Sequence, residues 1–168
     1  MLWVLVLVLV VFSALMLTGM RRVLVVFSGS ALLRISGAAL FVASVFVALT
    51  AVGGGVTVAA GVDKFPVSWL TGTLFSSYLL PGLVLAGVVG GSAAVAAVTA
   101  LGSRERATLW SMLAGAILLG WLAGERLILP PAAFSPQFWW LEAIYVAAGL
   151  MMLVPAAAIR GLGRKGRP

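Results

Sequence analysis

The feature that most constrains this chain is a series of apolar runs, each close to the length that a bilayer-crossing helix needs. Five runs cover about residues 2–20, 35–60, 78–101, 108–129 and 139–159. A helix rises about 1.5 Å per residue, so roughly 20 residues cross a hydrocarbon core about 30 Å thick. We therefore expect an all-α integral membrane protein. Residues 1–168 form a single membrane domain in this interpretation, a compact bundle of about five transmembrane helices with short loops.

Composition supports lipid as the solvent. Hydrophobic residues make up 63% of the 168 residues, and charged residues make up 9%. A soluble domain has roughly 45–50% apolar and about 25% charged residues. A core of this size cannot bury such an excess of apolar surface, so much of it must face lipid.

Two residue types are absent, and their absence narrows the chemistry. Without cysteine there are no disulfides, iron–sulfur clusters or thiol redox reactions, and without histidine the commonest metal and haem ligand is missing. The sequence also has no phosphate-binding loop, nucleophile–base pair or metal-ligand spacing. We therefore expect no cofactor, no metal site and no catalytic residue, and we do not expect an enzyme.

The first run could be a signal peptide or a retained helix. No basic region precedes residues 2–20 and no small-residue cleavage pattern follows them, which favours a retained helix that stops at Arg21-Arg22. Residues 23–33 and 67–77 are too short to span, so we expect interfacial segments there. Residues 160–168 read as a disordered, basic cytoplasmic tail.

The basic residues define an orientation. If the runs alternate in direction, nine of the eleven Lys and Arg residues fall on one side and only Lys64 and Arg126 fall on the other. By the positive-inside rule the amino terminus is then outside and the carboxy terminus cytoplasmic. Membrane orientation accounts for the net charge of +7, so we expect no nucleic-acid partner.

Small residues at helical spacing predict close helix packing. Gly82, Ala86 and Gly90 form one stripe of the third run, with Gly87 and Gly91 beside it. The fourth run carries Gly120 and Gly124. Small residues four apart let helix backbones approach closely. We expect all seven to pack against other helices.

Three charged residues near the outer face are the candidates for a polar site: Glu125, Arg126 and Glu142. Glu125 lies near the outer headgroups, where it has either a structural interfacial role or a functional role with a cation, a proton or Arg126 of another copy. Glu142 stands in the first turn of the last helix, where the helix dipole favours an acid. Alternatively, the two carboxylates converge and share a proton or a cation.

Aromatic residues predict interfacial belts, in which indole and phenol rings lie at headgroup depth. The outer belt is assigned to Trp69, Tyr78, Trp121, Trp139 and Trp140. Hydroxyl residues within the runs, such as Ser44, Thr50 and Ser92, are expected to bond to their own helix backbone.

The sequence SWLTGTLFSSYLLPGLVL begins at residue 68, and it is followed by an Arg-bearing turn, by GWLAGE from residue 120 and by a Trp-bearing entry to the last helix. In these features the chain resembles an uncharacterised group of small bacterial membrane proteins with about four helices. The resemblance covers about residues 35–153, and the first run is an addition. It implies a multi-pass protein of the bacterial plasma membrane and no particular activity.

Three functions remain open on this sequence. The first is an accessory or scaffold subunit that docks in the bilayer, with other membrane subunits or further copies of itself as partners. The second is a small-solute or cation transporter or channel that uses Glu125 and Glu142. The third, a lipid-modifying enzyme, lacks the expected residues. We favour the accessory subunit.

Overall fold

The computed structural model describes residues 2–62, 65–71, 73, 75–129 and 139–165, and side-chain surroundings from residue 13 to residue 161 within these ranges. Every regular element in this part of the chain is helical. The long helices are α1 (Leu2–Val26), α2 (Ala31–Ala59), α5 (Arg104–Ile128) and α6 (Trp139–Lys165). A fifth is built from α3 (Leu79–Val84), the π-helical η2 (Leu85–Gly90) and α4 (Gly91–Ala100). A 3₁₀ turn, η1 (Val67–Leu70), lies between α2 and α3.

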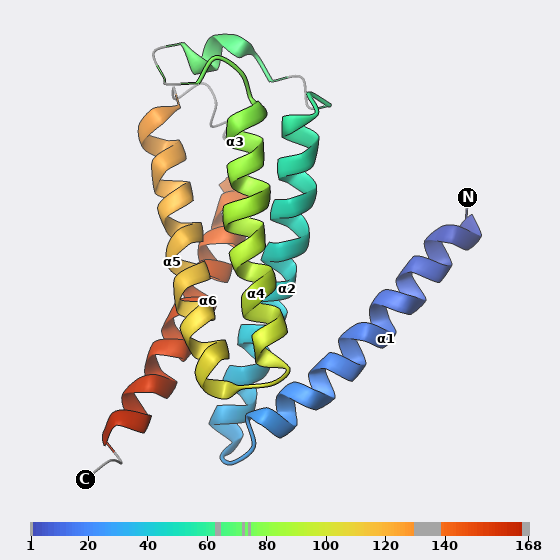
Figure 1. Ribbon diagram of the computed structural model, residues 1–168, viewed down its shortest axis with the longest axis vertical. Coiled ribbons are helices and arrows are strands. Elements are labelled where there is room, and N and C mark those ends of the chain that lie inside the picture. Colours follow the sequence, from blue (N-terminus) through green and yellow to red (C-terminus); the bar gives the residue numbers. More distant parts are fainter. Residues whose placement is uncertain (1, 63–64, 72, 74, 130–138, 166–168) are drawn as a thin grey trace.

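The last four long helices form a bundle in which each packs most extensively against two others (Figure 1). Helix α2 packs against α3–η2–α4 and α6, and α5 packs against α4 and α6. Successive helices run in opposite directions, so the pairs that are adjacent in the chain are antiparallel (Figure 1). Helix α1 packs against the lower part of α2 and diverges from the bundle toward its amino terminus (Figure 1).

Several helix ends differ from those expected from hydropathy. Helix α1 continues past Arg21-Arg22 to Val26, and α2 begins at Ala31, so residues 23–33 form no separate interfacial segment. Helix α6 continues through Arg160 to Lys165, so these residues are helical and not a disordered tail. The physical reason is that charges mark where lipid ends, whereas arginine itself is a good helix former.

Caps and turns, rather than charges, set the helix ends. The hydroxyl of Ser30 accepts a hydrogen bond from the Leu33 N–H at 3.4 Å and begins α2. Ser103 does the same for Arg106 at 3.4 Å, so α5 begins at Arg104, four residues before the apolar run. Such a cap contributes about 1 kcal/mol. Gly29, with φ of 131°, makes the turn between α1 and α2.

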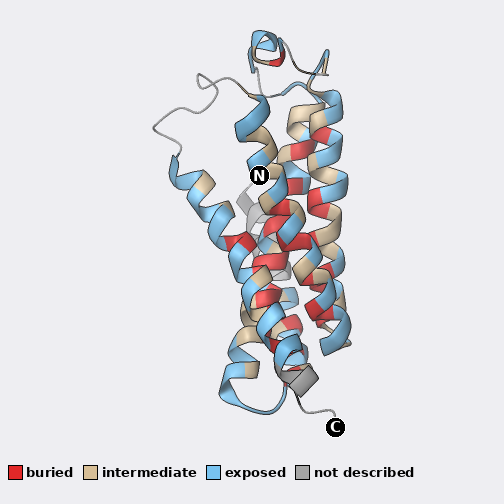
Figure 2. Ribbon diagram, turned by 90° about the vertical axis from the view of Figure 1, so that its left-hand side faces the viewer, coloured by how far each residue is buried: buried red, intermediate tan, exposed pale blue. Residues whose placement is uncertain are grey.

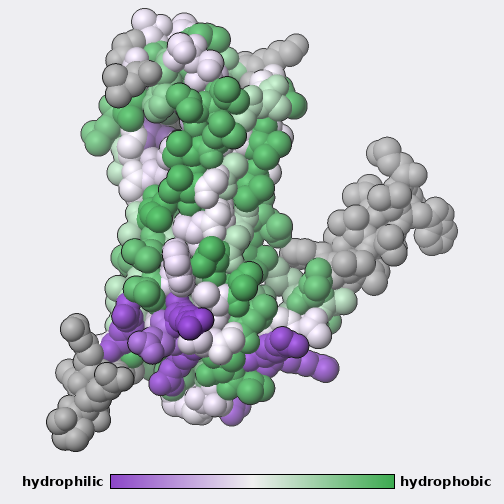
Figure 3. Space-filling view, in the orientation of Figure 1, coloured by the Kyte–Doolittle hydropathy of each residue, from purple (hydrophilic) through white to green (hydrophobic). Residues whose placement is uncertain are grey.

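Buried and exposed side chains of the bundle differ in size. Buried residues lie along the inner sides of the helices (Figure 2). Half of the buried hydrophobic residues in the described chain are alanines, among them Ala51, Ala93, Ala96 and Ala114, and they pack with larger side chains such as Leu40, Leu118 and Met152. Other large apolar side chains point outward, and they cover the length of the bundle (Figure 3). They include Ile35, Val42, Leu49, Val56, Leu83, Val98, Leu113 and Val154. An exposed apolar surface of this extent is typical of a region that contacts a membrane or another protein.

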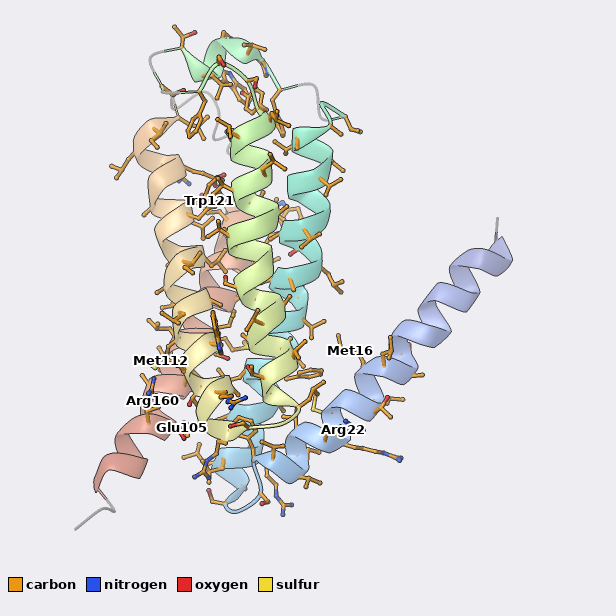
Figure 4. All side chains as sticks on the ribbon, viewed as in Figure 1. Met16, Arg22, Glu105, Met112, Trp121 and Arg160 are labelled. Atoms are coloured by element: carbon orange, nitrogen blue, oxygen red, sulfur yellow. The ribbon has the colours of Figure 1, made fainter. Side chains whose placement is uncertain are left out.

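Four helices are long and apolar enough to cross a membrane in the described part of the chain. They are Ala31–Ala59, Leu79–Ala100, Arg104–Ile128 and Trp139–Gly161. Charged side chains gather at one end of the bundle, where Figure 4 places Arg22, Glu105 and Arg160. We call this the basic end. The opposite end, covered by η1, is the aromatic end (Figure 1).

Candidate functional site

The closest helix contact joins α2 to α3 and η2 through glycines. A Cβ atom on Gly55 would lie 2.5 Å from both the Ala86 nitrogen and the Gly82 oxygen. A Cβ atom on Gly82 would lie 2.6 Å from the Ala59 nitrogen and the Gly55 oxygen. Real Cβ atoms do not approach backbone so closely, so only glycine permits this contact. The stripe predicted to pack does so here within the chain.

Gly90 extends the same contact toward the middle of the bundle. A Cβ atom there would lie 2.6 Å from Val52 Cγ2 and 3.0 Å from the Val52 nitrogen. The intervening residues form a π-helical turn, and such turns are rare and usually single. Gly82, Ala86 and Gly90 therefore all face α2.

A second glycine contact, between α5 and α6, was not expected from the sequence. A Cβ atom on Gly115 would lie 2.8 Å from the Gly149 oxygen and 3.2 Å from the Leu153 nitrogen. Gly149 in turn lies against the Leu119 side chain. The available signal was weak, because Gly115 follows Ser111 by four residues but has no glycine partner at that spacing.

The remaining predicted packing glycines face open space. Around Gly87 and Gly91, on η2 and α4, no described atom of a neighbouring helix lies within 4 Å of where a Cβ atom would be, and the same holds for Gly120 and Gly124 on α5. These four glycines therefore make no close contact with a neighbouring helix in the described chain, and the expectation that they pack against another helix stays a prediction. The reason is rotational: each pair lies on the outward side of its helix, roughly 100° from the neighbours that face inward.

The outer polar residues form an ion pair between α5 and α6. The Arg126 Nε donates to Glu142 Oε1 at 2.7 Å, and its Nη2 donates to Glu142 Oε2. Both carboxylate oxygens are therefore held in a fork, the geometry that arginine makes best. Arg126 thus bonds to a carboxylate of its own chain. Residues 63 and 64, expected on the same side, lie outside the described residues.

Glu125 has a different environment from Glu142. Its carboxylate is half-buried and accepts a hydrogen bond from the Trp121 side chain, one helical turn away. The negative charge of Glu142 lies close enough to act on it. The two carboxylates therefore do come near each other, but Arg126 occupies one of them. This arrangement balances charge across the α5–α6 contact more readily than it binds a cation.

The predicted aromatic belt divides into two kinds of position. Trp139 and Trp140 are exposed, whereas Trp121 packs against the alanine core in the outer half of α5 (Figure 4). Trp69 stacks near Phe65, with ring centroids 6.1 Å apart. Trp121 is therefore part of the core as well as the partner of Glu125.

At the aromatic end, Tyr78 joins the start of α3 to the segment that precedes η1. Its hydroxyl donates to the Pro66 carbonyl oxygen at 2.9 Å, and its ring lies 5.8 Å from that of Phe65. Burial raises the pKa of the Tyr78 hydroxyl above its usual value. The segment expected to lie in the interface is thus held to the start of α3.

Hydroxyl groups within the helices also divide into two kinds. Thr50 donates to the Phe46 oxygen at 2.8 Å and Ser92 donates to the Val89 oxygen at 3.0 Å, as expected. The hydroxyls of Ser44 and Ser111 are fully buried and have no hydrogen-bond partner among the described atoms. The expectation for Ser44 is therefore wrong. Each of these two serines takes the place of an alanine in the small-residue core.

Comparisons of the chain with family models, curated proteins and solved structures find no match.

Proposed function

We propose that the chain is a multi-pass membrane protein whose bundle and α1 together cross the bilayer five times. The support is the extent of exposed apolar surface, because large aliphatic side chains cover the outside of the bundle while half of the buried hydrophobic residues are alanines. Contiguous apolar surface of this extent is stable in lipid and aggregates in water. In this proposal the bilayer is that of the bacterial plasma membrane.

We place the basic end in the cytoplasm and the amino terminus outside. Arg34, Arg104 and Arg106 lie at that end, as do Arg21, Arg22 and Arg160, which agrees with the positive-inside rule. Reporter fusions at Pro168 and in the loop at residues 63–68 test this orientation. The first should read cytoplasmic and the second external. A cytoplasmic signal from the loop would overturn the five-span topology.

Within that membrane, we propose a non-catalytic accessory or scaffold subunit that docks against a larger membrane protein through its open glycines. The observation that carries this proposal is the position of Gly120 and Gly124, which no described atom of a neighbouring helix approaches. Glycine inside a helix costs about 1 kcal/mol relative to alanine. Close packing of a partner helix at these positions would offset that cost, because small residues let helices approach closely in lipid.

A transporter that uses Glu125 and Glu142 is the less favoured function. Both oxygens of Glu142 bond to Arg126, so a cation would have to displace a bidentate guanidinium. Polar side chains at mid-bundle depth are few in the described chain, and the buried pair Ser44 and Ser111 carries no charge.

Co-purification of variants tests the docking proposal. A tagged chain is extracted from its native membrane in gentle detergent, and the proteins that accompany it are identified by mass spectrometry. Gly120→Leu and Gly124→Leu should each release the accompanying membrane protein. Gly53→Leu is the matched control, because Gly53 is an equally open helical glycine on α2.

Two results would contradict the proposal. Recovery of the wild-type chain alone, or with further copies of itself only, would argue against an accessory subunit. Retention of the same companion by all three leucine variants would show that the open glycines of α5 do not form the docking face.

A further inference from the structure

The basic end carries a group of arginines that come from four separate helices. We call them the arginine collar: Arg21, Arg22, Arg34, Arg104, Arg106 and Arg160. All six side chains are exposed. They belong to the end of α1, the start of α2, the start of α5 and the last part of α6, so they gather at one end of the bundle. Figure 3 shows hydrophilic residues collected at this end, and Figure 4 labels Arg22 and Arg160 there.

The collar has little negative charge of its own. Glu105 is the acidic residue that Figure 4 places at this end, between Arg104 and Arg106 in the sequence. The salt bridge found among the described residues lies at the opposite end, between Arg126 and Glu142. The positive potential of the collar is therefore not cancelled by carboxylates in the described chain.

Helix stability does not explain the three arginines of the collar that lie at the starts of helices. Arg34, Arg104 and Arg106 lie in the first turns of α2 and α5. The helix dipole is positive there and disfavours cations, by about 0.3–1 kcal/mol per charge at exposed positions. These arginines therefore add to a positive potential that the helix ends already produce.

The depth of the collar identifies the anion that it fits. Exposed apolar side chains begin directly beside it, with Ile35 next to Arg34 and Leu109 three residues beyond Arg106. The turn from α4 to α5 is short, so Arg104 cannot extend far from the apolar surface. Guanidinium groups at this boundary lie at the level of lipid headgroups, where phosphates are the available anions.

We propose that the arginine collar binds the phosphate headgroups of anionic phospholipids in the cytoplasmic leaflet. This inference rests on the proposed membrane embedding and is independent of the docking face on α5. Arginine pairs with phosphate oxygens in the same forked geometry that it uses with carboxylates. Charged lipid therefore collects around this end in preference to zwitterionic lipid with the same acyl chains.

Lipid retention by the purified full chain tests the proposal. The protein, bound to an affinity resin in neutral detergent, is incubated with equal amounts of phosphatidylglycerol and phosphatidylcholine that have identical chains, and the retained lipids are extracted and quantified. The wild-type chain should enrich phosphatidylglycerol, on the order of tenfold at low salt. At 1 M salt, where the Debye length is about 3 Å, the enrichment should largely disappear. Inorganic phosphate at millimolar concentration should not displace the lipid, because it lacks the apolar contacts.

Variants in the α4–α5 turn assign the effect to the collar. Arg104→Gln/Arg106→Gln should reduce the enrichment several-fold, with about fivefold per arginine as the upper limit. Glu105→Gln, in the same turn, should raise it because it removes a negative charge. Gly120→Leu should leave it unchanged, which separates this test from that of the docking face.

Three outcomes would overturn the proposal. Equal retention of the two lipids by the wild-type chain would show that the collar does not select charge. An enrichment that survives in Arg104→Gln/Arg106→Gln would place the lipid elsewhere. Release of an accompanying protein by that variant, with unchanged lipid retention, would identify an acidic protein surface as the occupant. Retention of neither lipid would instead contradict the membrane embedding itself.

Discussion

The glycines of this bundle fall into two groups with opposite surroundings. Gly55, Gly82, Gly90 and Gly115 are closed, because backbone or side-chain atoms of a neighbouring helix lie within 3 Å of where a Cβ atom would be. Gly120 and Gly124 are open, as are Gly87 and Gly91 on the neighbouring helix, with no described atom of another helix within 4 Å of that position. Both groups occur in apolar helices.

A stripe of small residues therefore indicates that another helix can approach closely, but it does not identify which helix. The closed glycines explain how α2 reaches α3 and η2, and how α5 reaches α6. The open glycines have no such use inside the described chain. In our account they serve contacts between chains, and substitutions at the two groups should therefore behave differently.

The largest effect is expected at Gly55, in the closed group. Gly55→Leu places a side chain where the Gly82 oxygen and the Ala86 nitrogen already lie, so α2 and α3 must separate. We expect a loss of about 3 kcal/mol or more, at the upper end of overpacking costs. Thermal unfolding in detergent measures this, with Gly53→Leu as the control for an open position on the same helix. Similar melting temperatures for the two variants would contradict the close contact.

An alanine substitution should have opposite signs in the two groups. Gly120→Ala adds a methyl group in open space and removes the conformational freedom of glycine, so it should stabilise the isolated chain by about 1 kcal/mol. Gly115→Ala should destabilise it, because its methyl group would meet the Gly149 oxygen at 2.8 Å. Denaturant titration of the two variants measures both changes. A destabilising effect of Gly120→Ala in the isolated chain would show that this position is already packed.

A smaller effect is expected at Ser44, within the closed interior. Its buried hydroxyl has no described hydrogen-bond partner, so Ser44→Ala removes an uncompensated polar group and leaves an alanine like its neighbours. We expect a gain of up to about 1 kcal/mol in the free energy of unfolding. The matched control is Ser92→Ala, which removes a hydroxyl that does bond to its helix. A clear loss of stability in Ser44→Ala would reveal a partner for this hydroxyl.

The smallest effect is expected at the exposed ion pair that joins α5 to α6. Glu142→Gln removes the charge from the carboxylate that Arg126 holds, but both side chains remain partly solvated. Exposed ion pairs contribute little, so the melting temperature should fall by less than it does for Gly115→Ala. Reversal of both charges, Arg126→Glu with Glu142→Arg, should restore most of the loss. A loss as large as that from Gly115→Ala would mean that the fork, and not the glycine contact, holds these helices together.

Hydropathy was sufficient to predict the helical class and the approximate position of each long helix. It could not predict helix ends, because α1 and α6 continue through their arginines. The stripe at Gly82 packs against α2, whereas Gly120 meets no neighbouring helix within the described chain. When the surface of a bundle is as apolar as its core, hydropathy in a single sequence does not indicate which side of a helix faces the other helices.

The sequence indicated which residues form the candidate polar site, but it did not indicate that Arg126 pairs with Glu142. Glu125, Arg126 and Glu142 do lie near one another, as the short connection between their helices indicated. Which carboxylate Arg126 takes depends on the register between α5 and α6. That register is set by Gly115 and Gly149, a contact between glycines that no motif in the sequence marks.

Site-specific photo-crosslinking in native membranes is the most direct test of whether α5 carries a docking face for another membrane protein. Leu113 precedes Gly120 by two helical turns on α5 and is 44% exposed, and Leu49 on α2 is 55% exposed, so each can be replaced by p-benzoylphenylalanine without disturbing the core. If α5 carries the docking face, the probe at position 113 forms a discrete adduct with another membrane protein, whereas the probe at position 49 labels lipid alone. The absence of an adduct at position 113, or the same adduct from both positions, would contradict a docking face on α5.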